Sequence, residues 1–597
     1  MGSINNSNTA ARGNRPAPYP LPQTPYNAAK PVSAIIIGAG IAGIATAVLL
    51  QAKVPALTLT VFDRHSHVGG TWWENQYPGV RCDVPSHAYQ LSFAPNPHWS
   101  EFYAKGQEIR EYYEGVVHKY GVDKHLHLQH EVVRAVWTVD RWSVTVRDLA
   151  AQTERVVEAN FLVSCTGRLN RASLPSIPGL STFQGPVMHT ALWDDGVDLA
   201  GKRVAVIGNG ASGMQVLPAI LPHVSHLTHF ARTRNWVSAA FNGGLAAQAA
   251  QKGNPAGHAI PQEQRDHFAS PAGAHDYLAY RKEIEATFHT GFAGFVLGSE
   301  ANAQLRETLT ALIAERVNHD PALLAKLLPD YAPLCKRLTP APGYLEALSD
   351  PKVDFVQARI RQVTPAGITT VDGHTYPVDA IVAATGFPDN LTPAYPLIGR
   401  SGVDLRDVWA PGTGTVGYPK SYFGVMAPRF PNYFFVLQTQ GTPFGGTVPV
   451  KCEQTATYIA QCIRKIQAQG YAALEPSDEA TDDFDAVVEG FFADKTTSDS
   501  CSSWWKQGGG DGDGGGRVVI SWPGTMHHKG DITRTPRWED FCFQRDAASK
   551  HNRFHYFANG LAAREEGQAN ADELTSYLTT AEDVDLQTLH EGWTRGY

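Results

Sequence analysis

The chain has 597 residues, of which 43% are hydrophobic and 18% are charged. This length is enough for about four domains of ~150 residues each, so the chain can bury more than one hydrophobic core. The formal net charge is -8 and the basic residues are scattered, which excludes the clustered positive surface typical of nucleic-acid or anionic-membrane binding. We therefore expect small-molecule partners, with no nucleic-acid partner and no membrane partner.

The cysteines indicate neither a metal site nor a disulfide framework. Seven are present, and the closest two, Cys452 and Cys462, are ten residues apart, so there is no CxxC pair. We expect seven reduced thiols in a cytoplasmic protein that binds no metal. Residues 1–30 are rich in Asn, Pro, Ala and Ser and lack the apolar core of a signal peptide, so we expect a disordered tail there.

The first apolar segment, residues 32–52, carries no charge and has the length of a membrane span. Within it, however, the β-branched residues 33–37 end at a glycine turn, and a helical pattern of apolar residues begins only at Ile41. A strand, a turn and a helix explain this order better than one membrane helix does.

The turn has the dinucleotide-binding spacing Gly38-x-Gly40-x-x-Gly43. The first glycine permits the tight turn, the second lets the backbone approach a pyrophosphate, and the third lets the helix pack closely on the sheet. A second strand, residues 57–62, ends at Asp63, 20 residues after Gly43, where an acid accepts a ribose hydroxyl. We expect FAD here; the alternative is a glycine loop without a ligand.

Residues 69–83 read GGTWWENQYPGVRCD and are dense in glycine and aromatic side chains. Such a segment can place its backbone against the flat ring of a ligand. By composition alone, an aromatic-capped surface loop is the alternative.

A second fingerprint follows a strand over residues 204–207 and has the residues Gly208, Gly210, Ser212 and Gly213 in the same spacing. The next strand, residues 227–231, ends at Arg232, 19 residues after Gly213, where a 2′-phosphate needs a cation. This favours NADPH over NADH. Arg234 shares that role, or both arginines are solvated surface charges.

Two further strands, Phe161–Ser164 and residues 379–384, each run into a glycine bend on either side of the second fingerprint. They predict an α/β fold with two Rossmann-like dinucleotide-binding domains, the NADPH domain being inserted into the FAD domain. We expect the FAD domain over residues 31–170 and 387–597 and the NADPH domain over 171–236 and 334–386. Apolar residues three and four apart predict a helical insertion over 237–333, either a cover for a cleft or an appendage.

Between the fingerprints lies Phe183-x-Gly185-x-x-x-His189-x-x-x-Trp193-Asp194. Together with residues 69–83, this segment resembles the paired signatures of Baeyer-Villiger monooxygenases, and the resemblance covers most of the chain from about residue 30. It implies an enzyme that uses FAD, NADPH and O2 to convert ketones to esters or lactones through a C4a-peroxyflavin. His189 is expected to couple the domains and to transfer no proton.

The resemblance also implies residue roles. Arg337 lies beside the flavin, Asp83 holds that arginine in place, and Lys336 helps to hold NADPH. Tyr89 and Trp504 line the flavin and nicotinamide side of the pocket. The remaining implied cofactor contacts are Gly70, Thr71, Trp72, Asp83, Val132, Gln215 and Thr233.

Arg337 also has a physical case of its own. The reaction passes through a peroxide anion and then an anionic tetrahedral adduct, and a guanidinium that stays charged can stabilise both in a dry site. The alternative is a structural ion pair between Arg337 and Asp83.

The carboxyl-terminal third departs from the family pattern in two places. Residues 438–443 read QTQGTP where the family commonly has a Gly-Pro-Ser-like turn, and the glycine-rich residues 508–516 interrupt a stretch that follows Trp504. Ordering so many glycines costs much backbone entropy, so we expect either a mobile loop beside Trp504 or an unrelated flexible hairpin.

Three other functions compete with ketone oxidation. The nearest is a flavin monooxygenase that oxygenates amines or sulfides with the same cofactors. A flavin disulfide reductase requires a dithiol pair, which the cysteine spacing does not offer. An NADPH-sensing binding protein requires Arg337 and Asp83 to be incidental. The identity of the ketone and the oligomeric state stay open.

Overall fold

The computed structural model describes residues 19–242, 259–387, 391–412, 414–507, 516–565, 571–575 and 578. The chain divides into two compact units. The smaller comprises Met1–Lys30, Arg464–Ala472 and Gln544–Tyr597, and the larger comprises Pro31–Ile463 and Ala473–Phe543. All the residues expected to act at the site belong to the larger unit.

In the smaller unit, residues 19–30 are not a free tail. The Tyr26 amide donates to the Leu561 carbonyl at 2.7 Å, and the Asn559 amide donates to the Thr24 carbonyl at 3.0 Å. The expectation of disorder is therefore wrong for residues 19–30, because a partner more than 500 positions away, invisible to local sequence patterns, satisfies their backbone groups. Residues 1–18 lie outside the described residues.

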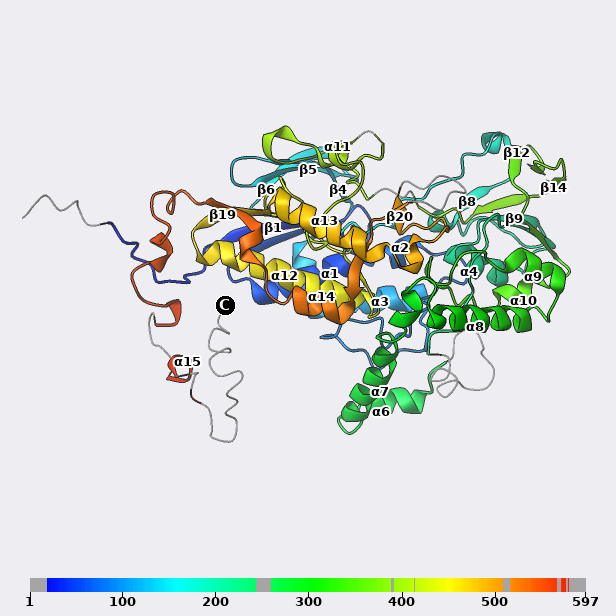
Figure 1. Cartoon of the computed structure of the whole chain (residues 1–597), viewed down its shortest axis with the longest axis horizontal. Helices are drawn as coiled ribbons and strands as arrows, with labels where there is room; N and C mark the ends of the chain where they lie inside the picture. The colour runs from blue at the N-terminus through cyan, green and yellow to red at the C-terminus, as the bar shows by residue number, and fades with distance from the viewer. Residues whose placement is uncertain are drawn as a thin grey trace, which may run out of the picture. The chain divides into compact units, whose positions relative to one another are not determined.

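In the larger unit, the first Rossmann-like fold is built on a parallel five-stranded sheet of order β17-β7-β1-β2-β3. The predicted strand, turn and helix at its start are confirmed as β1 and α1 (Figure 1). None of the helices in the described residues has both the length and the apolar content to cross a membrane. The elements are β1 (Val32–Ile37), α1 (Ile41–Lys53), β2 (Leu57–Phe62), β3 (Leu126–His127), β7 (Phe161–Ser164) and β17 (Tyr433–Phe435).

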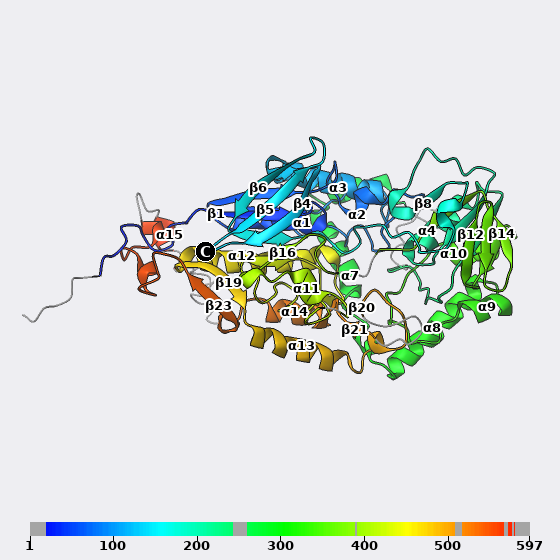
Figure 2. The same ribbon diagram turned by 90° about the horizontal axis from the view of Figure 1, so that it is seen from above.

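A second, mainly antiparallel sheet of order β16-β4-β5-β6 covers this fold. Trp137 and Trp142 of that sheet share one hydrophobic core with Ile35 and Ile37 of β1, which explains why the two sheets lie against each other (Figure 2). The strands are β4 (His130–Trp137), β5 (Trp142–Asp148), β6 (Thr153–Ala159) and β16 (Leu397–Ile398).

Several helices and short strands complete the first fold. Near its start are α2 (Thr71–Glu74) and α3 (Gly106–Lys119), and later in the chain come α11 (Leu405–Trp409), α12 (Val448–Ala468), α13 (Asp478–Phe492) and α14 (Met526–Ile532). Three short strand pairs lie in the chain's carboxyl-terminal third: β18 (Thr442–Phe444) with β22 (Ser521–Thr525), β19 (Tyr471–Pro476) with β23 (Phe541–Arg545), and β20 (Lys506–Gln507) with β21 (Arg517–Val518).

The second Rossmann-like fold has its own parallel sheet, of order β11-β10-β9-β15-β8. An antiparallel sheet, β12-β13-β14, packs beside it. The elements are β8 (Val187–His189), β9 (Arg203–Ile207), α4 (Ala211–Ile220), β10 (His226–Phe230), α10 (Tyr344–Leu348), β11 (Val353–Val356), β12 (Ile360–Thr364), β13 (Gly367–Thr370), β14 (Thr375–Pro377) and β15 (Ala380–Ala383).

The expected helical insertion is present, and it packs against both folds. Leu309 and Ile313 of α8 enter the core of the second fold, while Ile284 of α7 packs on Phe102 and Tyr103 of the first. It is therefore packed into both folds; whether it covers a cleft or has no active-site role stays a prediction. Its described helices are α6 (Gln262–Ala269), α7 (Ala274–Thr287), α8 (Glu300–Arg316) and α9 (Pro321–Leu327).

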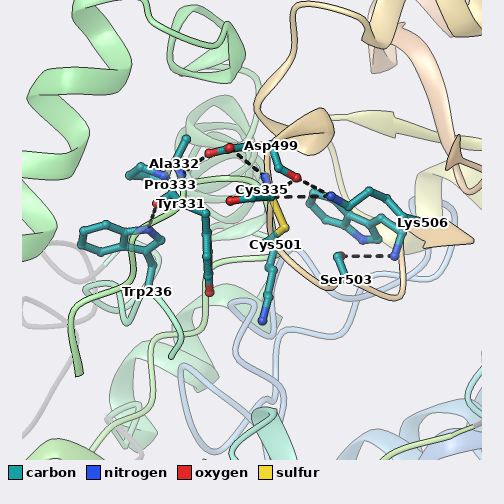
Figure 3. Close-up of a disulfide and its surroundings, with 12 residues drawn as sticks. Trp236, Tyr331, Ala332, Pro333, Cys335, Asp499, Cys501, Ser503 and Lys506 are labelled. Carbon is teal, nitrogen blue, oxygen red and sulfur yellow. Dashed lines mark hydrogen bonds between the residues drawn. A yellow bond between two sulfur atoms is a disulfide. The ribbon is translucent and has the colours of Figure 1, made fainter. Parts of the chain in front are cut away.

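A disulfide joins Cys335 to Cys501 (Figure 3), so the expectation of seven reduced thiols is wrong. The two cysteines are 166 residues apart in sequence, yet their Cα atoms are 6.1 Å apart in the fold. A search for closely spaced cysteine pairs cannot find such a bond, because only the tertiary structure brings the two segments together. The five free cysteines are Cys82, Cys165, Cys452, Cys462 and Cys542.

Hydrogen bonds reinforce this cross-link. The Ala332 amide donates to the Asp499 carboxylate at 2.6 Å, and the Lys506 ammonium donates to the Asp499 carbonyl at 2.6 Å (Figure 3). The segment that carries Lys336 and Arg337 is thus fastened to the segment that carries Trp504.

We predict that replacing both disulfide cysteines (Cys335→Ser with Cys501→Ser) lowers the melting temperature. A cross-link closing so long a loop contributes about 2–4 kcal/mol, largely by restricting the unfolded chain. Thermal unfolding checks this, with exposed Cys542→Ser as the matched control. An unchanged melting temperature, together with free Cys335 and Cys501 thiols on peptide mapping of the wild type, would contradict the cross-link.

Candidate active site

The two predicted glycine turns have the same backbone geometry. Gly38 and Gly208 both have φ +105°, a conformation that L residues rarely adopt. A Cβ on Gly38 would collide with the Cys165 carbonyl, and one on Gly208 with the Ala384 carbonyl. Each turn therefore requires its first glycine for two independent reasons.

The other glycines of each turn have the functions that the spacing predicts. A Cβ on Gly43 would overlap the Gly38 carbonyl, and one on Gly213 would overlap the Gly208 carbonyl, so each helix packs closely on its own turn. Gly40 and Gly210 are the N-caps of α1 and α4, and no side chain caps either helix. The open amides and the positive end of each helix fit a pyrophosphate.

Asp63 follows β2 as expected and braces the first turn. Its carboxylate accepts hydrogen bonds from the Ala39 amide at 2.6 Å and the His65 amide at 2.8 Å. A carboxylate has further lone pairs, so a ribose contact is compatible with this position and stays a prediction.

At the corresponding edge of the second fold, Arg232 is exposed just after β10. Arg234 forms an ion pair with Asp330 at 3.1 Å. Thr233 accepts a hydrogen bond from Asn209 in the second glycine turn at 2.6 Å, which ties this edge to the turn. Arg234 is thus paired with a carboxylate.

The aromatic run, residues 69–83, packs against the first glycine turn. Gly70 has φ +54° and its backbone packs against Gly40, placing Thr71 and Trp72 of α2 beside the first turn. Trp72 donates to the Tyr89 hydroxyl at 3.3 Å.

From the same run, the Tyr77 hydroxyl donates to Gln215 of α4 at 2.8 Å, and Gln215 donates to the Arg81 carbonyl at 3.0 Å. A Cβ on Gly79 would lie 2.7 Å from the Gln215 carbonyl. The sequence analysis predicted Gln215 as a cofactor contact but did not predict these hydrogen bonds between the folds. The only local sequence signal for them was the Tyr-Pro-Gly of residues 77–79.

Arg337 and Asp83 lie together although 254 positions separate them. The guanidinium donates two hydrogen bonds to the carboxylate, at 2.5 and 2.6 Å. Burial works against the charge of Arg337, but Asp83 outweighs it and raises the pKa of the guanidinium above its ordinary value. The Arg337 side chain is still 38% exposed, so a ligand has access to it.

Lys336, the neighbour of Arg337, faces the second fold. Its ammonium donates to the Asn235 side chain at 3.2 Å and lies 5.1 Å from the Tyr331 ring centre. Burial and the nearby Lys506 lower the pKa of Lys336 to about 8.

His189 ends β8 and holds the connection between the folds. The Ala191 amide donates to its Nδ1 at 3.0 Å, so the proton is on Nε2, which donates to the Gly386 carbonyl at 3.0 Å. Burial lowers the pKa of His189, so the ring stays neutral. With both nitrogens engaged, the side chain serves as a hydrogen-bonded joint.

One expected cofactor contact, Val132, lies apart from this cluster, and one expected loop lies mostly outside the described residues. The Val132 side chain is buried in the core between the first two sheets, which leaves only its backbone to meet a ligand. Residues 508–515, most of the expected glycine-rich loop, lie outside the described residues.

Sequence comparison places this geometry among known enzymes. A family model described as an NAD(P)-binding Rossmann-like domain matches residues 36–105. The FAD-binding monooxygenase moxY of Dothistroma septosporum is 33% identical over 88% of this chain and 82% of its own length. A protein named Baeyer-Villiger monooxygenase from Streptomyces coelicolor is 34% identical over 83% of this chain and 89% of its own length.

Solved structures agree with the sequence relatives. The crystal structure of cyclohexanone monooxygenase from Rhodococcus sp. Phi1 bound to NADP+ superposes with a TM-score of 0.72 at 27% identity, covering 86% of this chain and all of that one. The fold is therefore that of two-domain flavin monooxygenases, and the cofactors are FAD and NADPH. The chain belongs to the Baeyer-Villiger family of FAD-dependent, NADPH-using monooxygenases.

Proposed function

We propose that this enzyme inserts an oxygen atom next to the carbonyl of a ketone and releases an ester or lactone. The observation that carries the proposal is the accessible Arg337 guanidinium, fixed by two hydrogen bonds to Asp83 at the meeting of the two nucleotide folds. The name of the Streptomyces relative supports the same reaction.

When bound, FAD and NADPH would supply the redox chemistry, which is hydride transfer and the activation of O2. We propose that the first glycine turn, Asp63, the Gly70 to Trp72 segment, Tyr89 and the Val132 backbone hold FAD. Gly208, Gly210, Ser212, Gly213, Gln215, Arg232, Thr233, Lys336 and Trp504 hold NADPH or line its side of the pocket. The domain boundaries given above follow this division.

Arg337 supplies the fixed positive charge that ketone oxidation needs. Attack on a carbonyl carbon requires an anionic oxygen nucleophile and leaves a negative charge on the former carbonyl oxygen. A guanidinium that never loses its proton stabilises both without rearranging. Asp83 sets the orientation of the guanidinium through two hydrogen bonds.

The rival function is oxygenation of amines or sulfides. Such soft nucleophiles react with a protonated oxidant and gain little from a permanent cation beside it. The bidentate geometry of Arg337 and Asp83 therefore favours the ketone reaction. A purely structural ion pair would not require the guanidinium to stay accessible to a ligand.

We predict that Arg337→Ala still allows anaerobic reduction of the flavin by NADPH but lowers ester formation about 100- to 1000-fold, the usual loss when a donor to a developing oxyanion is removed. Stopped-flow absorbance measures the first step and product chromatography the second.

Arg203→Ala is the matched control, because Arg203 forms a bidentate ion pair with Asp379 in the second fold. It should leave ester formation unchanged. Ester formation at the wild-type rate in Arg337→Ala would refute the catalytic role.

We also predict that the affinity of the FAD-loaded enzyme for NADP+ falls as pH rises through about 8, the pKa of Lys336. A bound phosphate stabilises the charged ammonium and raises its pKa, so binding is strongest below pH 8 and weakens above it. Titration calorimetry between pH 6.5 and 9.5 measures this.

Lys336→Met should remove the pH dependence and weaken binding at pH 7. Lys326 is the control, because its ammonium donates to the Phe355 carbonyl in the same fold. Lys326→Met should retain the pH dependence of NADP+ binding. The same pH slope in wild type and Lys336→Met would count against this role.

A further inference from the structure

Three cations that the reaction above does not use converge on one short segment. Lys529 of α14 donates to the Gly441 carbonyl at 2.8 Å, and Lys451 of α12 donates to the Pro443 carbonyl at 3.2 Å. Arg168, which follows β7, approaches the Thr442 hydroxyl at 3.5 Å. We call these three residues the cation triad. Its members come from widely separated parts of the chain, so the fold assembles them.

In the part of the chain that the structure describes, the cation triad has no counter-charge. Within the described residues, no carboxylate forms an ion pair with any of the three. The two acids closest in sequence have other partners: Glu453 accepts from the Ser92 amide at 2.7 Å, and Asp531 pairs with Arg534 at 2.9 Å. Lys451 is 6% exposed and Lys529 is 1% exposed, so water compensates little of their charge.

The pKa values reflect this isolation. Burial, followed by repulsion from Lys529 and Arg168, lowers the pKa of Lys451 to about 7. Burial lowers the pKa of Lys529 to about 8 and that of Arg168 to about 10. Burying an unpaired charge costs folding free energy. A protein therefore retains such a charge where a bound ligand or another group compensates it.

The donors are also incompletely used. An ammonium group has three N–H donors, and Lys451 and Lys529 each donate one to a backbone carbonyl. Those remaining donors, on neighbouring positive groups, suit the oxygens of an anion.

The location of the cation triad connects it to the candidate active site. Arg168 follows β7, and its partner segment follows β17, the neighbouring strand at the carboxyl edge of the first sheet, where ligands of such folds bind. The Arg168 guanidinium lies 4.7 Å from the centre of the Trp504 ring. Arg337 is close enough to Lys451 to lower its pKa.

The other expected anions already have their own partners. The two open helix N-termini fit the pyrophosphates, and Asp83 neutralises Arg337 in the resting enzyme. The positive charge of the cation triad is therefore surplus to the cofactors' phosphates and to the ion pair.

We propose that Arg168, Lys451 and Lys529 form an anion subsite that binds a carboxylate on the ketone substrate. This assignment rests on the proposed function and narrows its substrate class to keto acids. The subsite anchors the acidic end of the molecule by charge-assisted hydrogen bonds, and the ketone end extends toward Arg337.

The test titrates the FAD-loaded enzyme, without NADPH, with 4-acetylbenzoate and with its methyl ester, following the oxidised flavin spectrum. The acid should bind at least tenfold more tightly than the ester, as expected from the strength of hydrogen bonds to charged groups. Lys451→Met and, separately, Lys529→Met should abolish this preference. Both variants should fold, because replacing an unpaired buried charge with an apolar side chain relieves a cost.

Lys420→Met is the matched control, since Lys420 is already ion-paired with Asp482. It should retain the preference for the acid. Equal binding of acid and ester by the wild type, or an acid preference that survives both substitutions, would overturn the proposal.

The cation triad has one competing occupant, the negative charge of the reduced flavin ring. Affinity of the oxidised enzyme for sulfite, which forms an anionic flavin adduct, reports on that charge. Weaker sulfite binding in Lys451→Met with an unchanged acid-to-ester ratio would assign the cations to the flavin and overturn the subsite.

Turnover of the neutral methyl ester by the wild type tests the proposed function separately. If 4-acetylbenzoate, its methyl ester and other neutral ketones all give no oxygenated product, ketone oxidation fails. The acid-to-ester binding ratio still decides the anion subsite.

Discussion

The ion pair between Arg337 and Asp83 is the contact on which the arrangement of the site depends. Its two members lie 254 positions apart and belong to segments that carry the expected NADPH and FAD contacts. The pair forms only when the second fold lies against the aromatic run of the first. Tyr77 and Arg81 of the aromatic run join the same two folds through neutral hydrogen bonds to Gln215, and His189 bonds Gly386 within the second fold.

The charges of the site fall into three states. Arg337 is charged and paired with Asp83, burial lowers the pKa of Lys336 to about 8, and within the described residues the cation triad has no carboxylate partner. A permanent charge suits an oxyanion that forms during the reaction. A titratable ammonium such as that of Lys336 suits a phosphate that binds and dissociates. Cations without a carboxylate partner suit the anionic group of a ligand. The disulfide between Cys335 and Cys501 fastens the segments that carry Lys336 and Trp504 to each other.

Much of the fold was predictable because its signals are local. The strands β2 and β7 begin and end at the predicted residues, and both glycine turns adopt the geometry that their spacing requires. The pairing of Arg337 with Asp83 was predictable from the family resemblance, because neither residue carries a local signal of the other. The sequence did not predict the long-range features. The disulfide, the pairing of residues 19–30 with the carboxyl-terminal segment and the cation triad each join parts of the chain that no periodicity or spacing relates.

Ketone oxidation can be measured directly by letting the FAD-loaded enzyme choose between cyclohexanone and thioanisole under 18O2 with NADPH. Mass spectrometry then identifies the labelled product. If Arg337 supports an anionic nucleophile, the dominant product is the lactone with one 18O atom between its ring carbons. Labelled sulfoxide without labelled lactone, at any ratio of the two substrates, would contradict ketone oxidation and assign the enzyme to soft nucleophiles.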